Sequence, residues 1–258
     1  MGVWRKLRYL AEPKSRAVLS DRSNAKADPT QSLTRDLFND TKFLLGRKPV
    51  KVIFDVGANR GDFTDQYLKY FPDASIHCFE PNPSTCETLK SRFRDNPRVN
   101  IHNVAVSKVQ GVEDFYCNKE SATDSLLLPA QNWKEWVDGK SDALLLASHI
   151  QAKTITLDQF CQDQSIHEID ILKIDTQGAE LLVLEGAHGL LQNRTVRVII
   201  AELLFVPVYG GQPFYYDVCS RFADYGYDLV NLYDCRYDDD TALQLKWADG
   251  VFVYRAFS

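Results

Sequence analysis

The chain has 258 residues, of which 45% are hydrophobic and 25% charged, and its formal net charge is −5 at pH 7. This composition is typical of a soluble globular protein with one full α/β domain and some additions, and the negative charge argues against a dedicated nucleic-acid binder, which would carry a basic surface. No apolar run reaches the roughly 18 residues of a transmembrane helix, and the six cysteines form no Cys-x-x-Cys pair. We therefore expect a cytoplasmic protein with reduced thiols and no zinc site.

The N-terminal part, residues 1–49, is predicted to be a basic arm followed by a capping helix. Residues 1–30 carry seven basic and three acidic residues. This favours a loosely ordered extension over an arm that lies on a membrane surface or a partner. Apolar spacing over residues 31–45 predicts a helix that packs on the edge of a sheet.

From residue 50 onward, strands alternate with helices, which predicts one domain over 50–258 with a mostly parallel sheet covered on both faces. The expected strands are 50–56, 74–79, 99–106, 169–174, 196–205, 227–233 and 247–255, and the expected helices are 62–71, 84–93, 156–161, 178–191 and 217–225. The alternating segment 112–117 follows a turn and is predicted to be a hairpin partner. Residues 118–150 show no clear strand; a lid or acceptor wall and simple packing at the rim explain them equally well.

The first strand leads into the sequence Asp55-Val56-Gly57-Ala58-Asn59-Arg60-Gly61. Glycines at this turn allow the backbone to turn tightly and approach a ligand, and the following helix directs free N–H groups to the same place. A dinucleotide-binding turn reads Gly-x-Gly-x-x-Gly without an acid before it, so a nucleotide-dependent oxidoreductase is disfavoured. Asp55 can face a cationic ligand group, and Glu80, which ends the next strand, suits a ribose diol. S-adenosylmethionine carries both groups.

Five segments occur in an order that resembles the FkbM family of S-adenosylmethionine-dependent methyltransferases. They are Phe54-Asp55-Val56-Gly57-Ala58-Asn59-x-Gly61, Phe79-Glu80-Pro81-Asn82-Pro83, Asn103-Val104-Ala105-Val106-Ser107, Thr156-Leu157-Asp158 and Leu172-Lys173-Ile174-Asp175-x-x-Gly178-Ala179-Glu180. The resemblance covers roughly residues 50–255. It implies a class I methyltransferase (Rossmann-like) fold, in which the sheet has seven strands and the last one is antiparallel. It also implies methyl transfer to a hydroxyl of a sugar, polyketide or other natural product, with S-adenosylhomocysteine as the product.

The resemblance also implies roles for individual residues. The segment from Gly57 through Ala58 and Asn59 to Gly61, with Thr64 on the helix, would wrap the methionine moiety, and Asp55 would hold its ammonium directly or through water. Glu80, followed by Pro81 and Asn82, would hold the ribose, and Asn103, Val104 and Ala105 would flank the adenine. Asp124 and Ser125 match a family position near the cofactor less closely. Asp175 would lie beside the sulfonium and the acceptor. Two positions later this chain has Gln177 in place of a common acidic residue, which leaves a second carboxylate role there open.

Attack by an alcohol requires loss of its proton, to a general base or with the help of a metal. Four acids, Asp55, Glu80, Asp175 and Glu202, fall at or near the carboxyl ends of strands, where ligands bind in such sheets. Among them, Asp175 is the first candidate for the catalytic base and Glu202 is the second. For Glu180, a structural role at the start of its helix is favoured. Tyr209 lies on a glycine-containing loop, where it could contact the acceptor. The alternatives are a non-catalytic cofactor-binding scaffold and a nitrogen or carboxylate acceptor. The sequence leaves a divalent metal and a homodimer open.

Overall fold

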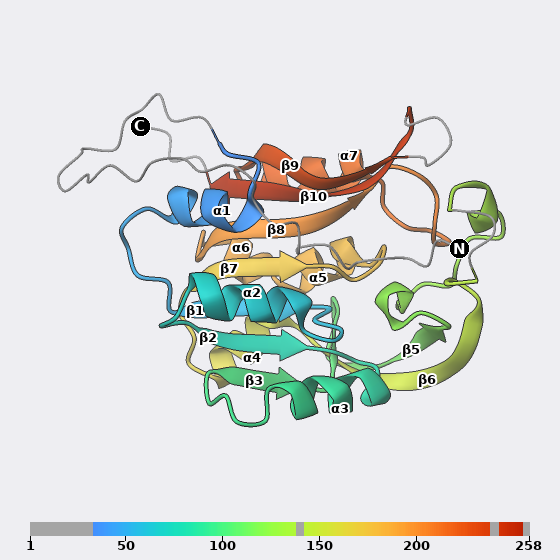
Figure 1. Cartoon of the computed structure of the whole chain (residues 1–258), viewed down its shortest axis with the longest axis horizontal. Coiled ribbons are helices and arrows are strands. Elements are labelled where there is room, and N and C mark those ends of the chain that lie inside the picture. Colours follow the sequence, from blue (N-terminus) through green and yellow to red (C-terminus); the bar gives the residue numbers. More distant parts are fainter. Residues whose placement is uncertain (1–32, 138–141, 238–242, 255–258) are drawn as a thin grey trace, which may run out of the picture.

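The computed structural model describes residues 33–137, 142–237 and 243–254 (Figure 1). The basic arm predicted over residues 1–30 lies outside this part of the chain. None of the helices in the described residues has the length and apolar character needed to cross a membrane.

The main sheet has seven strands in the order β3-β2-β1-β7-β8-β10-β9. They span Val99–His102 (β3), Ser75–Phe79 (β2), Val52–Val56 (β1), Ile169–Ile174 (β7), Val196–Leu204 (β8), Leu245–Tyr254 (β10) and Tyr227–Tyr237 (β9). The first five pair in parallel, whereas β10 is antiparallel to both β8 and β9. The prediction of a seven-stranded, mostly parallel sheet with an antiparallel last strand is confirmed.

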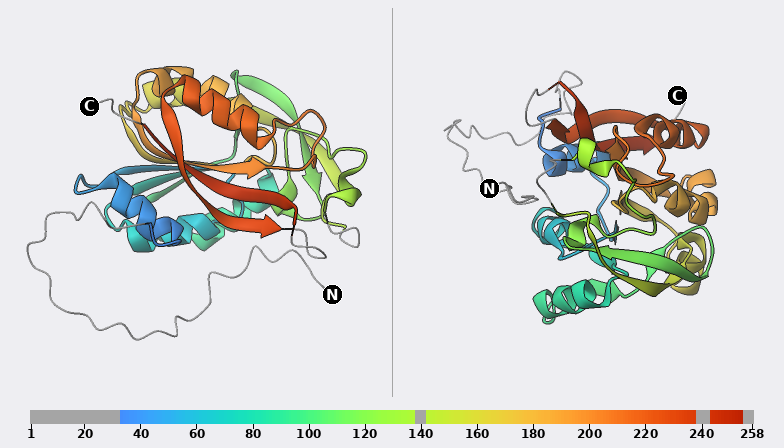
Figure 2. Two further views of the ribbon diagram at one scale, coloured as in Figure 1. Left: turned by 90° about the horizontal axis from the view of Figure 1, so that it is seen from above. Right: turned by 90° about the vertical axis from the view of Figure 1, so that its right-hand side faces the viewer.

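Helices cover both faces of this sheet (Figure 2). One face carries α1 (Leu37–Leu45), α2 (Asp62–Tyr70) and α3 (Pro83–Arg92), and the other carries α4 (Leu157–Asp163), α5 (Glu180–Gly186), α6 (His188–Gln192) and α7 (Tyr215–Asp224). Each layer has its own core: Ile53 packs with Tyr67 of α2 on the first face, and Phe54 packs with Leu157 of α4 on the second. The alternation of β1 thus directs Ile53 and Phe54 to opposite sides.

A second, three-stranded sheet has the order β4-β6-β5, formed by Ala105–Val106 (β4), Gly111–Asn118 (β5) and Leu146–Ile155 (β6). Two sequence predictions were wrong here. The expected strand 99–106 is divided between the two sheets, and the partner of β5 is β6 rather than 99–106. Strand β6 begins inside the segment expected to lack strands. Its first four residues, Leu146 to His149, are all exposed. Two apolar residues are followed there by two polar ones, so the sequence lacks the alternation that would reveal a strand.

The segment before β6 packs over the end of β8. Trp133, Val137 and Leu144 form an apolar cluster with Val206 and Val208. Backbone hydrogen bonds join the two segments, since Ala130 N donates to Val208 O at 2.9 Å and Gly210 N to Leu128 O at 2.8 Å. In Figure 1 this green segment lies at the side toward which the parallel strands point.

Candidate functional site

A cleft opens where β1, β2 and β7 end, beside the small sheet. The empty space within it, counted together with the part that is open to solvent, is about 510 Å³. The lining combines an apolar slot with carboxylates and is formed by Val56, Gly57, Asn59, Phe79, Glu80, Pro81, Val104, Ala105, Val106, Phe115, Ser121, Ala122, Asp124, Leu126, Asp175, Thr176 and Gln177.

Only part of the predicted site lines this cleft. The lining includes Gly57, Asn59, Glu80, Pro81, Val104, Ala105 and Asp175, whereas Asp55, Ala58, Gly61, Thr64, Asn82, Asn103, Ser125 and Glu202 lie outside it. Several of the second group support the first. Asn103 Nδ2, for example, donates to the carbonyl oxygens of Glu80 and Pro81 at 2.9 and 3.0 Å.

The two glycines of the first loop are required by contacts within the protein. Gly57 has φ of +78°, and a β-carbon there would lie 1.9 Å from the carbonyl oxygen of Asp175. Gly61 has φ of +85°, and its β-carbon would meet the side chains of Phe93 at 2.4 Å and Leu89 at 2.6 Å. Both positions therefore exclude larger residues even without a ligand.

Asp55 is buried and points toward α2. Its Oδ2 accepts a hydrogen bond from Thr64 Oγ1 at 2.8 Å, and in the parallel pairing of β1 and β7 it lies opposite Lys173. Asp55 does not line the cleft.

Glu80 ends β2 at the edge of the cleft and is held at both carboxylate oxygens. Oε2 accepts from Asn59 N at 2.9 Å and Oε1 from Asn82 N at 2.8 Å. Burial raises the pKa of Glu80 to about 8, against the two backbone hydrogen bonds, which lower it. When Glu80 is ionised, each oxygen keeps a further lone pair for a ligand hydroxyl.

Asp124 brings a second carboxylate to the same wall from the segment 121–125. Its Oδ2 accepts from Asn82 Nδ2 at 2.7 Å and its Oδ1 from Asn118 N at 2.6 Å. Burial raises the pKa of Asp124 to about 6. The same segment bonds to the first loop, because Ser121 Oγ donates to Asn59 Oδ1 at 3.0 Å. Hydrogen bonds therefore hold the segment across the loops that follow β1 and β2.

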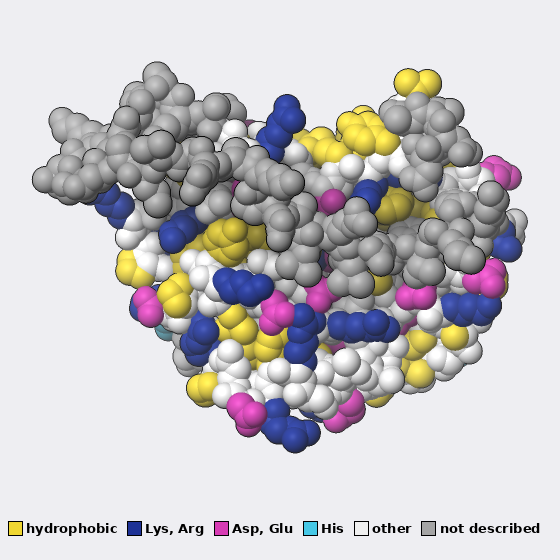
Figure 3. All heavy atoms as spheres, viewed as in Figure 1, with side chains coloured by type: hydrophobic (Ala, Val, Ile, Leu, Met, Phe, Trp, Pro, Cys, Tyr) yellow, Lys and Arg dark blue, Asp and Glu magenta, His cyan; other side chains and the backbone are white. Residues whose placement is uncertain are grey.

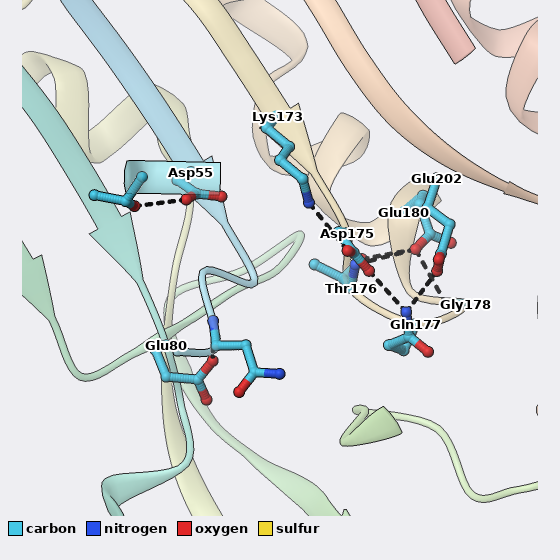
Figure 4. Close-up of polar contacts among 11 residues, drawn as sticks. Asp55, Glu80, Lys173, Asp175, Thr176, Gln177, Gly178, Glu180 and Glu202 are labelled. Atoms are coloured by element: carbon cyan, nitrogen blue, oxygen red, sulfur yellow. Dashed lines mark hydrogen bonds and ion pairs between the residues drawn. The ribbon is translucent and has the colours of Figure 1, made fainter. Parts of the chain in front are cut away.

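Asp175 and Glu202 come from the ends of the neighbouring strands β7 and β8. Lys173 Nζ lies 3.0 Å from Asp175 Oδ2. The Gln177 amide nitrogen donates to Asp175 Oδ1 at 2.7 Å and to Glu202 Oε2 at 2.6 Å. Figure 4 shows the Gln177 amide between the two carboxylates, with Asp55 and Glu80 at the other side of the view. The structure thus brings together the two predicted catalytic acids.

The loop after β7 is fixed by Glu180, as its predicted structural role requires. Glu180 Oε1 accepts from Thr176 N at 3.2 Å, from Thr176 Oγ1 at 3.2 Å and from Gly178 N at 3.1 Å. Burial raises the pKa of this carboxyl to about 7. Glu180 therefore shapes the loop that carries Gln177 and does not line the cleft.

Sequence reasoning missed the part of the lining that comes from strand β5 of the small sheet and from the segment between β5 and β6. These residues are Phe115, Ser121, Ala122 and Leu126. No motif marks them; the only signal was the interruption of the strand–helix alternation. Among the described residues, no three His, Cys, Asp or Glu side chains gather in a way that could hold a metal ion.

Comparison with known proteins identifies the family. A family model described as "Methyltransferase FkbM domain" matches residues 55–229. The chain belongs to the FkbM methyltransferase family. The match includes the first loop, Glu80, Asp175 and Glu202, so the cleft lies within the part shared with the family.

Relatives of this FkbM-family chain include 2-O-methyltransferase NoeI of Sinorhizobium fredii, which is 28% identical over 172 residues that cover 64% of this chain and 68% of the relative. The 31-O-demethyl-FK506 methyltransferase FkbM of Streptomyces tacrolimicus is 26% identical over 201 residues, covering 70% of this chain and 77% of the relative. O-methyltransferase hasC of Aspergillus fumigatus is 44% identical over 103 residues, which cover 39% of this chain and 22% of the relative. The FkbM-family chain is a methyltransferase that depends on S-adenosylmethionine.

The cleft has the chemistry that this cofactor needs. Phe79, Val104 and Phe115 give apolar walls for a flat base, and Glu80 gives hydrogen-bond acceptors for a diol. The residues of the FkbM-family site therefore fit S-adenosylmethionine.

Proposed function

We propose that the protein transfers a methyl group from S-adenosylmethionine to a hydroxyl of a small-molecule acceptor, a sugar or natural product. The names of its relatives, a 2-O-methyltransferase, a 31-O-demethyl-FK506 methyltransferase and an O-methyltransferase, support an oxygen acceptor. The observation that carries the proposal is that one cleft is lined by the Asp175 carboxylate, by Glu80 and by apolar residues such as Phe79 and Val104.

In this proposal, the residues of the cleft hold the cofactor along its length. Glu80 accepts hydrogen bonds from the ribose hydroxyls, and Val104 and Ala105 flank the adenine. The backbone of the loop Gly57 to Gly61 surrounds the methionine moiety. The predicted residues outside the lining, Asp55, Thr64, Asn82, Asn103 and Ser125, act by holding these groups in place or through water.

Asp175 accepts the proton of the acceptor hydroxyl in the proposed reaction. Bound S-adenosylmethionine supplies an electrophilic methyl group on a sulfonium. Lys173 holds one oxygen of Asp175, so the carboxylate keeps one orientation toward the cleft. Glu202 supports this arrangement through Gln177. A positioned base of this kind contributes about 100-fold to 10,000-fold in rate.

The acceptor wall in this proposal is the segment 118–150. Its described residues reach the cleft through Ser121, Ala122 and Asp124 and pack on the loop after β8 through Trp133 and Leu144. Acidic and basic side chains are interspersed on the face of the molecule seen in Figure 3.

The test is transfer of a labelled methyl group from S-adenosylmethionine to a panel of sugars, glycosides and polyketides. We expect a methyl ether product, and we expect Asp175→Asn to lower the rate at least about 100-fold with little change in S-adenosylhomocysteine binding. The control is Asp163→Asn, at an exposed position of α4, which should keep the wild-type rate. Product methylated at nitrogen or a carboxylate would correct the acceptor class, and cofactor binding without transfer to any acceptor would favour the scaffold alternative.

A further inference from the structure

A second pocket lies between α5 and α7, which are neighbours on one face of the main sheet (Figure 2). The empty space within it, counted together with the part that is open to solvent, is about 980 Å³. Leu127, Leu181 and Pro213 contribute apolar surface to its lining, and Asp217 and Arg221 contribute charged groups. The binding of the cofactor, as described above, does not use this pocket.

Only a thin partition separates the second pocket from the cofactor cleft. Leu126 and Gln177 line the cleft, and the residues that follow them in the chain, Leu127 and Gly178, line the pocket. The side chains of Leu126, Leu127 and Gln177 are half-buried, so the partition itself is partly open to solvent. Gly178 follows Asp175 by three residues, so their Cα atoms lie within about 11 Å of each other. A ligand with more than one ring can therefore extend from Asp175 to the pocket.

Gln212 fixes the wall of the pocket on this side. Its side chain is buried and hydrogen-bonded at both ends of the amide: Oε1 accepts from Val208 N at 2.8 Å and from Tyr209 N at 2.7 Å, and Nε2 donates to Val206 O at 2.9 Å. A β-carbon at Gly178 would lie 3.2 Å from the β-carbon of Gln212. The loops after β7 and β8 thus pack closely together, and this wall is already formed without a ligand.

The charged groups of the pocket suit a neutral, hydroxylated ligand. Arg221 is half-buried, and within the described part of the chain its guanidinium forms no hydrogen bond or ion pair. It offers N–H donors, and the carboxylates of Asp217, Asp224 and Glu185 offer acceptors. Three acids against one arginine disfavour a phosphate or sulfate ligand. A hydroxyl group, in contrast, can accept from the arginine and donate to the acids.

Aromatic side chains extend the rim of the pocket at the start of α7. The rings of Phe214 and Tyr216 are stacked, with centroids 5.6 Å apart and planes inclined by 11°, and Tyr216 is 55% exposed. Tyr216 lies one helical turn before Ser220, which lines the pocket. An exposed ring beside hydrogen-bonding groups offers a flat apolar surface to the C–H face of a sugar ring.

We propose that the pocket between α5 and α7 binds a sugar ring of the acceptor other than the ring that is methylated. This inference rests on the proposed function and narrows its acceptor to a glycoside with at least two rings, of which the outer one is uncharged. Arg221 and the three acids hold the hydroxyls of the outer ring, while the methylated hydroxyl lies at Asp175. These residues select the acceptor and take no part in the transfer of the methyl group.

The experiment measures kcat and KM for matched pairs of acceptors, each a methyl glycoside with one ring and a disaccharide glycoside that contains the same ring, such as methyl β-galactoside and methyl β-lactoside. In the wild type, we expect kcat/KM to be at least about tenfold higher for the two-ring member of an accepted pair, mainly through a lower KM. Ser220→Trp, which occupies the pocket, and Arg221→Gln, which removes its charged donor, should each lower this preference about tenfold. Transfer to the one-ring member and S-adenosylhomocysteine binding should stay unchanged.

The control is Ala223→Trp, which adds the same bulk at an exposed position of α7 outside the pocket lining and should keep the wild-type preference. Equal use of both members of the accepted pairs by the wild type would overturn the inference. So would an unchanged preference in folded Ser220→Trp, or equal losses for one-ring and two-ring acceptors. If Ser220→Trp does not fold, Arg221→Gln decides by the same criteria. Absence of transfer to any hydroxylated acceptor would contradict the proposed function itself, which is a different result from transfer without the predicted preference.

Discussion

A β-carbon at Gly57 would lie 1.9 Å from the carbonyl oxygen of Asp175. The turn after β1 therefore lies against the end of β7, where Asp175 N also donates to Val56 O at 3.0 Å. The cofactor loop and the proposed catalytic carboxylate thus depend on the same backbone contact.

Replacement of Gly57 by alanine should damage both parts of the site. We expect Gly57→Ala to lower the free energy of unfolding by at least about 3 kcal/mol, because a left-handed backbone costs about 1 kcal/mol for alanine and the clash adds to it. Gly211→Ala is the matched control, since Gly211 has a similar φ of +75° and nothing within 4 Å of its β-carbon position. Urea unfolding of both variants measures the difference; equal losses would show that the Asp175 contact is unimportant.

Asn82 combines a structural and a functional contact. Its Oδ1 caps α3 by accepting from Ser84 N, and its Nδ2 donates to Asp124. Asn82→Ala should cost about 1 kcal/mol or more in stability and should also weaken S-adenosylhomocysteine binding severalfold. The comparison is Asp36→Ala, which removes the N-cap of α1 far from the cleft. Loss of affinity in both variants would mean that the effect comes from stability alone.

Glu80 should make stability depend on pH. Because burial raises its pKa from 4.5 to about 8, the folded protein holds a proton between these values that the unfolded chain has released. The free energy of unfolding should therefore fall as pH rises through this window. Asp124 and Glu180 shift in the same direction. In Glu80→Gln the free energy of unfolding should fall less steeply, by about 1 kcal/mol per pH unit. Urea unfolding at several pH values from 5 to 8 measures this dependence. The same dependence on pH in the variant and the wild type would contradict the prediction.

Glu180 should be important for stability although it lies outside the cleft lining. Its removal leaves the backbone N–H groups of Thr176 and Gly178 without their carboxylate acceptor, and we expect Glu180→Ala to cost about 3 kcal/mol. Glu185→Ala, at an exposed position on the same helix, should cost less than about 0.5 kcal/mol. Thermal unfolding of the two variants decides the matter, and similar melting temperatures would contradict this account of the loop.

The main sheet was predictable because its strands are short apolar runs separated by helical patterns, and because the acids at their ends fall at one edge. Strand β7, for example, is buried along its whole length and appears in the sequence as a continuous apolar segment apart from Asp170 and Lys173. The closing strands β9 and β10 were also predicted, and the antiparallel direction of the last strand followed from the family resemblance. Periodicity gives the type of an element and, in a parallel sheet, the edge at which its end lies.

The small sheet was not predictable in the same way. Exposed residues at the start of β6 give no period, and the pairing of β5 with β6 joins residues far apart in sequence, from Asn118 with Leu146 to Gly111 with Thr154. For the same reason the contributions of Ser121 and Leu126 to the cleft were missed. The link between Asp175 and Glu202 through Gln177 depends on side-chain directions at two strand ends, which sequence spacing does not determine.

Calorimetric titration of the purified chain with S-adenosylhomocysteine, repeated on Glu80→Ala, tests the central claim most directly. We expect micromolar binding by the wild type and at least about tenfold weaker binding, or about 1.4 kcal/mol, in the variant. The control Glu87→Ala, at an exposed position on α3, should bind like the wild type. Absence of binding by a folded wild-type chain would contradict the cofactor assignment, and equal binding by Glu80→Ala would contradict the role of Glu80 as the ribose anchor.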